Sequence, residues 1–115
     1  MGSKGRGGRG RFPAGANTMM KQVQQLQAQM LQAQDELAQE TVTASAGGGA
    51  VTVVISGQQE VHSVTIDPEA VDPAEVDMLQ DLIVAAMNEA LKKSRELAEG
   101  KMAPLTGALN IPGLT

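Results

Sequence analysis

The sequence contains no cysteine, tryptophan or tyrosine, and Phe12 is its one phenylalanine. Without cysteine there is no disulfide, no thiolate metal site and no cysteine nucleophile. Without aromatic rings there is no surface on which unpaired bases stack, which argues against recognition of single-stranded nucleic acid. The core must be built from Val, Ile, Leu, Ala and the seven Met residues. A core that thin usually requires a second chain.

Motifs for catalysis or metal binding are also missing. His62 is the only histidine, and a lone His on a strand is more often a packed or surface residue than a ligand or a base. The acids from Asp67 to Asp81 lack the spacing of a calcium loop, and no Lys-Ser/Thr pair follows Gly47 to Gly49 as in a phosphate loop. We therefore predict that the protein is not an enzyme and has no cofactor, metal site or small-molecule substrate.

Long apolar runs are absent as well. No stretch approaches the ~18 residues of a membrane span, and no apolar segment follows the charged N-terminus as in a signal peptide. The chain of 115 residues is long enough for one domain. These features predict a soluble cytoplasmic protein with no membrane contact.

The charge that is present is unevenly distributed. Residues 1–16 carry four cations and no acid, whereas the rest of the chain carries five cations against thirteen acids. Six of the thirteen glycines also lie in this stretch, which is the composition of a flexible arm. Arginine grips phosphate oxygens, and a glycine-rich chain can follow a nucleic-acid backbone without requiring a sequence. The arm therefore favours a polyanion, with a solubility tail as the alternative; its cations are Lys4, Arg6, Arg9 and Arg11.

The pattern after the arm predicts a helix over residues 18–40, capped by Asn17 or Thr18. Its apolar residues have heptad spacing, which most often marks a core or a dimer seam and also suits a partner helix. The residues between them are mostly Gln. The stripe consists of Met19, Val23, Leu26, Met30, Ala33 and Leu37.

Alternating sequence then predicts a three-stranded antiparallel meander. The glycines at 47–49 form the first turn and Gly57 lies in the second. In the third strand, residues 60–67, we expect Val64 and Ile66 on one face and Val61 on the other. Three strands with two free edges favour pairing with another copy.

A second helix is expected from Pro73, behind Asp72 as cap, to about Glu99, with Gly100 as its stop. The tail over 102–115 contains two prolines and two glycines and should be irregular. The fold class is thus α+β, in the order α-β-β-β-α, with an arm (1–16), a domain (17–101) and a tail (102–115). The stripe of this helix consists of Val76, Leu79, Ile83, Ala86 and Ala90, widened by Leu82, Met87 and Leu91.

The segments resemble the YbaB/EbfC family of nucleoid-associated proteins over about residues 17–113. The matching stretches are MMKQVQQLQAQM, GGGAVTVVISG, VTIDPE, MLQDLIVAAMNEALKKSRELAEGKM and LTGALNIPG. The resemblance implies a tweezer-like homodimer that binds DNA with little sequence preference and has no known catalysis. It also implies DNA contact through the helices and nearby termini, which here offer Lys21, Lys92, Lys93, Arg95 and Lys101.

We therefore expect a nucleoid-associated homodimer that contacts the backbone of duplex DNA electrostatically, alone or with DNA-processing proteins; RNA remains open. The alternative is an adaptor whose amphipathic helices dock a partner in a DNA-processing complex. If both helices fold back on the meander, they run parallel, and the arm lies near the acidic start of the second helix. The arm and Lys92 come to one end only if the helices project from the sheet or the dimer interleaves them.

Overall fold

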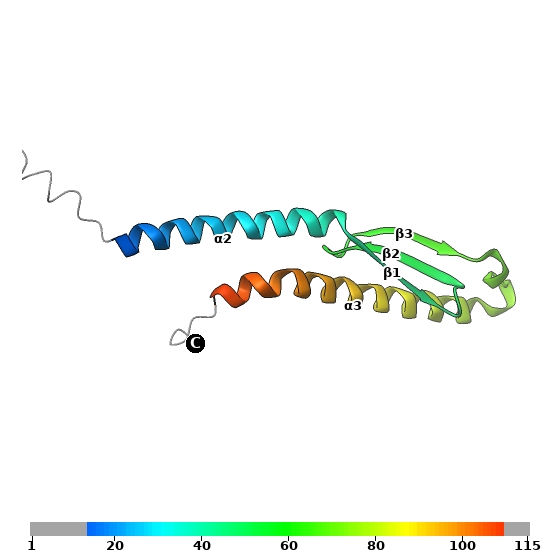
Figure 1. Cartoon of the computed structure of the whole chain (residues 1–115). Coiled ribbons are helices and arrows are strands. Elements are labelled where there is room, and N and C mark those ends of the chain that lie inside the picture. The colour runs from blue at the N-terminus through cyan, green and yellow to red at the C-terminus, as the bar shows by residue number, and fades with distance from the viewer. Residues whose placement is uncertain (1–13, 110–115) are drawn as a thin grey trace, which may run out of the picture.

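The computed structural model describes residues 14–109 and confirms the expected α+β order. Figure 1 shows a long helix, a sheet and a second long helix that returns beneath the sheet. The elements are α2 (Ala14–Gln39), β1 (Thr41–Ala46), β2 (Val51–Ser56), β3 (Val61–Ile66), η1 (Pro68–Ala70), η2 (Pro73–Glu75) and α3 (Val76–Leu109).

The core lies between α3 and one face of the sheet. The strand order is β1-β2-β3 with antiparallel pairing throughout, so β2 is the central strand. Its alternating residues Val51, Val53 and Ile55 are fully buried, and Ala86 and Ala90 of α3 pack against them. Alanine at the contact lets the helix approach the sheet closely.

The predicted three-glycine turn is confirmed, because Gly47, Gly48 and Gly49 all have positive φ, which a side chain would disfavour.

The third strand differs from expectation at one residue. Val53 pairs with Val64, but the register shifts after Val54, and Ile55 pairs with Val61. A β-bulge inserts one extra residue and reverses the alternation beyond it. Val61 therefore lies on the same side of the sheet as Val64, and the prediction that it faces the other way was wrong.

Both helices are longer than the sequence indicated. The first begins at Ala14, so Asn17 and Thr18 lie inside it rather than at its cap. The second passes through Gly100 and Pro104 and ends at Leu109, so the expected stop was wrong and the tail is helical to that residue. Pro104 lacks the N–H that would bond the Gly100 carbonyl. This stretch lies beside α2, and Gly100 and Pro104 line a hollow between the two helices.

The start of the second helix follows the prediction more closely. Asp72 caps the 3-10 turn that leads into α3, since its carboxylate accepts a hydrogen bond from the Ala74 N–H at 2.9 Å. Asp67 caps the preceding turn in the same way. Leu79 and Ile83 of the stripe pack on the core as expected, but Val76 is 47% exposed.

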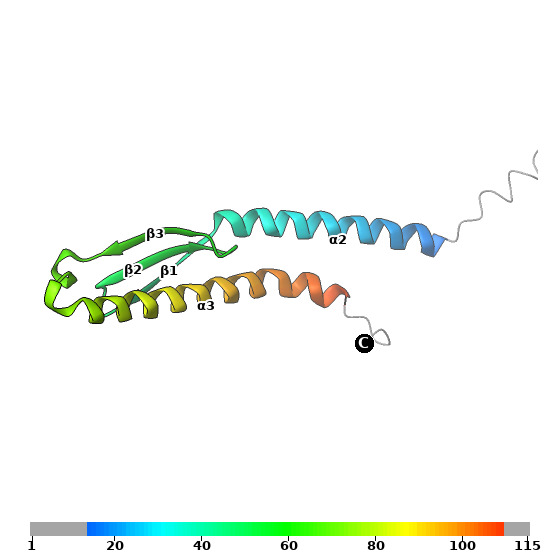
Figure 2. The ribbon, with the colours of Figure 1, turned by 180° about the vertical axis from the view of Figure 1, so that it is seen from behind.

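The two helices are antiparallel because α2 does not fold back over the sheet. It runs into β1 from beyond the sheet, and α3 returns beneath the sheet and continues along α2, as Figures 1 and 2 show from opposite sides. The described part of the molecule is therefore elongated. The helices thus project from the sheet, which was one of the two arrangements left open.

Candidate nucleic-acid interface

The four arm cations, Lys4, Arg6, Arg9 and Arg11, lie outside the described residues. What the structure does show is where the arm joins the domain. The start of α2 lies beyond the end of α3, at the far end of the molecule from η1, η2 and the start of α3 (Figures 1 and 2). The arm is therefore attached at the opposite end from the acids of residues 67–81.

Lys21 is the cation of α2, exposed on the half of the helix that projects past α3. It is the only charged residue between positions 17 and 34. Glu36, which lies beside α3, is fifteen residues further along, or ~22 Å of helix. Lys21 therefore stands apart from the cations of the other helix.

Lys92, Lys93 and Arg95 lie on the part of α3 that packs beneath the sheet. The residue between them, Ser94, is fully buried, and its hydroxyl donates to the Ser56 carbonyl at 2.7 Å. This bond fixes the rotation of α3, so that its neighbours are exposed at the surface. The Lys93 ammonium donates to the Thr43 carbonyl at 2.9 Å. Within the described part of the chain, Lys92 and Arg95 form no ion pair.

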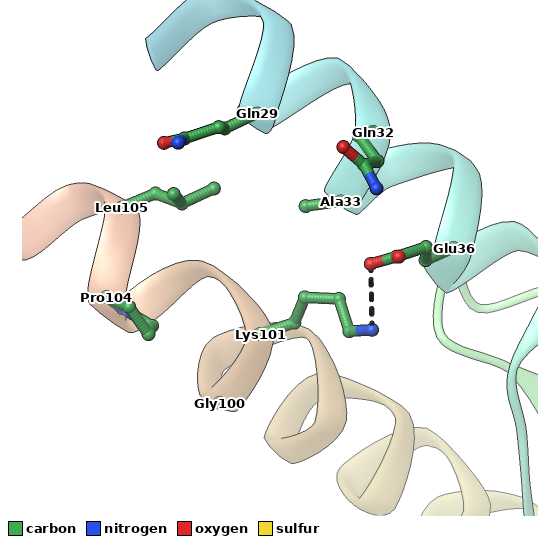
Figure 3. A pocket seen from close by; sticks show the side chains of 8 residues that line it. All are labelled: Gln29, Gln32, Ala33, Glu36, Gly100, Lys101, Pro104 and Leu105. Carbon is green, nitrogen blue, oxygen red and sulfur yellow. Dashed lines mark hydrogen bonds and ion pairs between the residues drawn. The ribbon is translucent and has the colours of Figure 1, made fainter. Parts of the chain in front are cut away.

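Lys101 is occupied by two carboxylates of the other helix. Its Nζ lies 3.2 Å from Glu36 Oε1, as Figure 3 shows, and 2.6 Å from Glu40 Oε2. Only 23% of its side chain is exposed. The hydrogen bonds to Glu40 and then Glu36 raise the pKa of Lys101, which keeps it charged. Lys101 joins α3 to α2.

The ion pair borders a cavity of about 390 Å³ between the helices. In Figure 3, Gln29 and Ala33 approach it from α2, and Leu105 and Pro104 from α3. Its one cation is the neutralised Lys101. We therefore assign it to the helix contact and not to a ligand.

Comparison with known proteins identifies the family. Residues 13–109 match the YbaB/EbfC DNA-binding family. The chain belongs to this family. The resemblance drawn from the sequence is therefore confirmed, and the chain stands among nucleoid-associated DNA-binding proteins.

Relatives within the family are similar over most of the chain. A nucleoid-associated protein of Desulforamulus reducens is 60% identical over 98 residues, which cover 85% of this chain and 93% of that protein. One from Alkaliphilus metalliredigens is 52% identical over 114 residues, 99% of each chain, so the aligned region includes the arm.

A solved structure supports the fold. The crystal structure of the uncharacterized protein HP0035 from Helicobacter pylori has a TM-score of 0.67 at 18% identity, over 76% of this chain and 92% of that one. At this identity the likeness concerns the fold alone.

For a YbaB/EbfC protein, the described domain offers few available cations. Glu89, Glu96 and Glu99 share the surface of α3 with Lys92 and Arg95. The surface of α3 therefore carries mixed charge.

Among the described residues, no group of three or more His, Cys, Asp or Glu side chains is arranged to hold a metal ion. In the same range, no helix is both long and apolar enough to span a membrane.

The partners of Lys101 were not predicted from the sequence. Glu36 and Glu40 precede it by more than sixty positions, and nothing local links them. The one available signal was the spacing of the two acids, because residues four apart lie on one face of a helix and can share a cation.

Proposed function

We propose that this YbaB/EbfC protein binds duplex DNA as a homodimer with little sequence preference, through electrostatic contacts to the backbone. The observation that carries the proposal is the antiparallel arrangement of α2 and α3. It attaches the basic arm at the end of the molecule away from the acidic start of α3. Because charges at physiological salt interact over only ~8 Å, these acids do not oppose an anion held at the arm.

In this proposal the residues contribute unequally. The arm cations provide most of the attraction, and Lys21, Lys92, Lys93 and Arg95 add contacts along the helices. Lys101 contributes least, because two carboxylates neutralise it. The domain acts mainly as a dimeric carrier for the arms, and the protein resides on the cytoplasmic nucleoid.

The proposed homodimer interface is the β3 edge of the sheet. The helix α3 covers β1 and β2 and leaves β3 at the margin. Val61 and Val64 are 41% and 42% exposed there, on the same side of the sheet. An apolar edge strand of this kind is a template for another copy.

The test is a fluorescence anisotropy titration of a labelled duplex at several salt concentrations. Three proteins are compared: the wild type, a variant with the four arm cations replaced by Ser, and a variant with Lys92, Lys93 and Arg95 replaced by Ala. Replacing charges in the arm keeps its length and leaves α2 intact from Ala14. Two arms make eight phosphate contacts, so their log-log salt slope should approach ~−7.

We expect the arm variant to lose most of the salt slope of the wild type. The helix variant should lose a smaller part of it. Equal loss in both would assign the binding to domain and arm alike, and loss in the helix variant alone would contradict the proposed role of the arm. If none of the three proteins binds duplex or RNA, the adaptor function takes precedence. Where the wild type does bind the duplex, competition with double-stranded RNA separates a preference for DNA from attraction to phosphate in general.

A further inference from the structure

The apolar stripe of α2 is buried at one end and bare at the other. Leu37 and Ala33, near the sheet, are 4% and 5% exposed. Leu26, further out, is half-buried, whereas Val23 is 54% and Met19 is 65% exposed. The heptad spacing continues unbroken along this series, so the change in burial reflects the end of α3 and not a change in the sequence.

The occupant of the bare half should be a helix. In the buried half, the stripe faces the C-terminal part of α3, which lies alongside α2. Residues spaced 4 and 3 apart form a straight seam that suits a helical partner along its whole length. The bare half also has a hollow of about 500 Å³ lined by Met19, Met20, Val23 and Gln24. Such a hollow can receive a side chain from a facing helix.

The chemistry of this face excludes a charged partner. Residues 22–34 contain no charged side chain, and glutamines flank the stripe. Lys21 is the one cation near this face that could contact a nucleic acid. An acidic or basic helix would form no ion pair along the seam. An identical α2 presents the same apolar stripe and the same neutral glutamines, so two copies meet without repulsion between like charges.

The arms decide the orientation of such a pair. In a parallel pair, two arms with four cations each would leave adjacent helix ends and repel each other. In an antiparallel pair they leave at opposite ends, and the two helix dipoles also oppose each other favourably. We propose that the N-terminal half of α2 is a second self-association surface, which pairs antiparallel with the same segment of another copy, with Val23 near the centre.

This surface is distinct from the β3 edge and does not depend on DNA binding. The β3 edge is at the sheet, whereas the bare half of α2 projects beyond the end of α3. A molecule with two self-associating surfaces can join dimers into larger assemblies. Such assemblies would link separate duplexes as well as coat a single one.

The first experiment uses the absence of cysteine in the chain. Single-cysteine variants Val23→Cys and Ala28→Cys are oxidised mildly, and disulfide-linked species are measured on a non-reducing gel. Ala28 is also exposed, but it lies nine residues from Met19, on the opposite side of the helix. We expect Val23→Cys to be trapped largely as a covalent pair and Ala28→Cys to remain at the background of random collision. Equal trapping of both would overturn the proposal.

The second experiment measures mass by sedimentation equilibrium over a range of protein concentrations. Val23→Glu is compared with Ala28→Glu, which adds the same charge outside the stripe; glutamate favours helix at least as well as valine, so α2 is retained. We expect Val23→Glu to lower the limiting mass at least twofold and Ala28→Glu to leave it unchanged. An unchanged mass in Val23→Glu would show that another segment or partner covers the stripe, and would also overturn the proposal.

The same measurement separates this proposal from the proposed β3 dimer. If both surfaces are used, Val23→Glu reduces the larger assembly to a dimer. If Val23→Glu yields a monomer, the α2 pair is supported and the β3 dimer fails. If the wild type is a dimer that only a β3 substitution dissociates, the β3 dimer is supported and the α2 pair is overturned.

Discussion

Gly57 is the residue at which α2 is fastened to the sheet. Its N–H donates to the Leu37 carbonyl at 2.9 Å and to the Glu40 carbonyl at 3.0 Å, which are orphan acceptors at the end of the helix. A neighbouring contact joins the Gln58 side chain to the Gln34 carbonyl at 2.8 Å. Because α2 has few other contacts with the sheet, these bonds set the direction in which it projects.

Substitution of this glycine should destabilise the fold. A Cβ at position 57 would lie 2.6 Å from Leu37 Cδ2 and 3.0 Å from the Leu37 carbonyl oxygen. We expect Gly57→Ala to lower the free energy of unfolding by about 1–3 kcal/mol, as overpacking does. Thermal unfolding at matched protein concentration measures the change.

Gly100→Ala is the matched control, because nothing lies within 4 Å of its added Cβ and the residue is inside α3. That substitution should raise stability by about 0.5–1 kcal/mol, the usual gain of alanine over glycine in a helix. A neutral Gly57→Ala would contradict the tight approach of α2 to the β2–β3 turn.

Lys101 should give the contact between the helices a pH dependence. Its pKa in the folded state is raised above the ordinary value of 10.5, first by Glu40 and then by Glu36. For a group whose pKa rises on folding, the stabilisation is complete below the unfolded-state pKa and is lost as pH rises through the folded-state pKa. The wild type should thus exceed Lys101→Met in stability at pH 8 to 10, and the two should converge as the pH rises through the raised pKa of Lys101. Denaturant titrations across this range, with Lys92→Met as control, measure the difference; a constant gap would contradict the role of the ion pair.

At the scale of elements, β3 is the strand with the least cover. Five of its six residues are exposed, and only Ile66 is half-buried. The bulge after Val54 brings Val61 to the side of the sheet that carries Val64, which concentrates apolar surface at this edge. A second copy placed there would bury both valines.

A charge at this edge should dissociate the proposed dimer. We expect Val64→Glu to weaken dimerisation at least tenfold, since an unpaired charge buried in an interface costs about 2–5 kcal/mol. Thr65→Glu places the same charge on the other face of the same strand and should leave the dimer intact. Sedimentation equilibrium in the Val23→Glu background isolates this interface. Equal effects of the two substitutions would assign the contact to strand edges in general and not to the valine face.

The elements that could be predicted from the sequence are those whose signals are local. The glycine turn, the alternation in β2 and the spacing of Ala86 and Ala90 each determine their structure within a few residues, and all three were confirmed. The bulge at β3 was missed, because an alternating pattern does not show where an extra residue enters.

The end of α3 and the availability of the candidate DNA-binding cations were harder to predict from the sequence, because both depend on contacts between residues far apart in the chain. Gly100 and Pro104 are local stop signals, yet α3 continues through both of them, beside α2, to Leu109. In the sequence, Lys101 and Lys92 are both lysines near the end of the second helix and cannot be told apart. Only the fold shows that two carboxylates neutralise Lys101. The arm was identified from composition, and its role stays a prediction.

The whole molecule has an acidic end and an end to which the basic arm is attached. Six acids and no cation lie between residues 67 and 81, around η1, η2 and the start of α3. From Asp77 to Lys101 is ~36 Å along the helix, several times the Debye length at physiological salt. These six acids are therefore spatially separated from the end of the molecule at which the arm is attached.

Neutralising the acidic end should have little effect on DNA binding at physiological salt. We expect Glu75→Gln with Asp77→Asn to change the Kd for a duplex by less than about twofold near 0.15 M salt. Near 0.01 M, where the Debye length reaches ~30 Å, the same variant should bind more tightly than the wild type. Anisotropy titrations at both salt concentrations test this. A tenfold tightening near 0.15 M would mean that the acids lie close to the bound DNA.

The consecutive order of the strands also bears on how the chain folds. Each strand pairs with its neighbour in sequence through a turn of four residues, so the sheet needs no long loop to close. Folding of such local topologies is fast, and the slow step is the meeting of segments distant in sequence. Here that step is the return of α3 to β1 and then to α2. The three-stranded meander can thus form early. The packing of α3 against the sheet and then against α2 completes the native state.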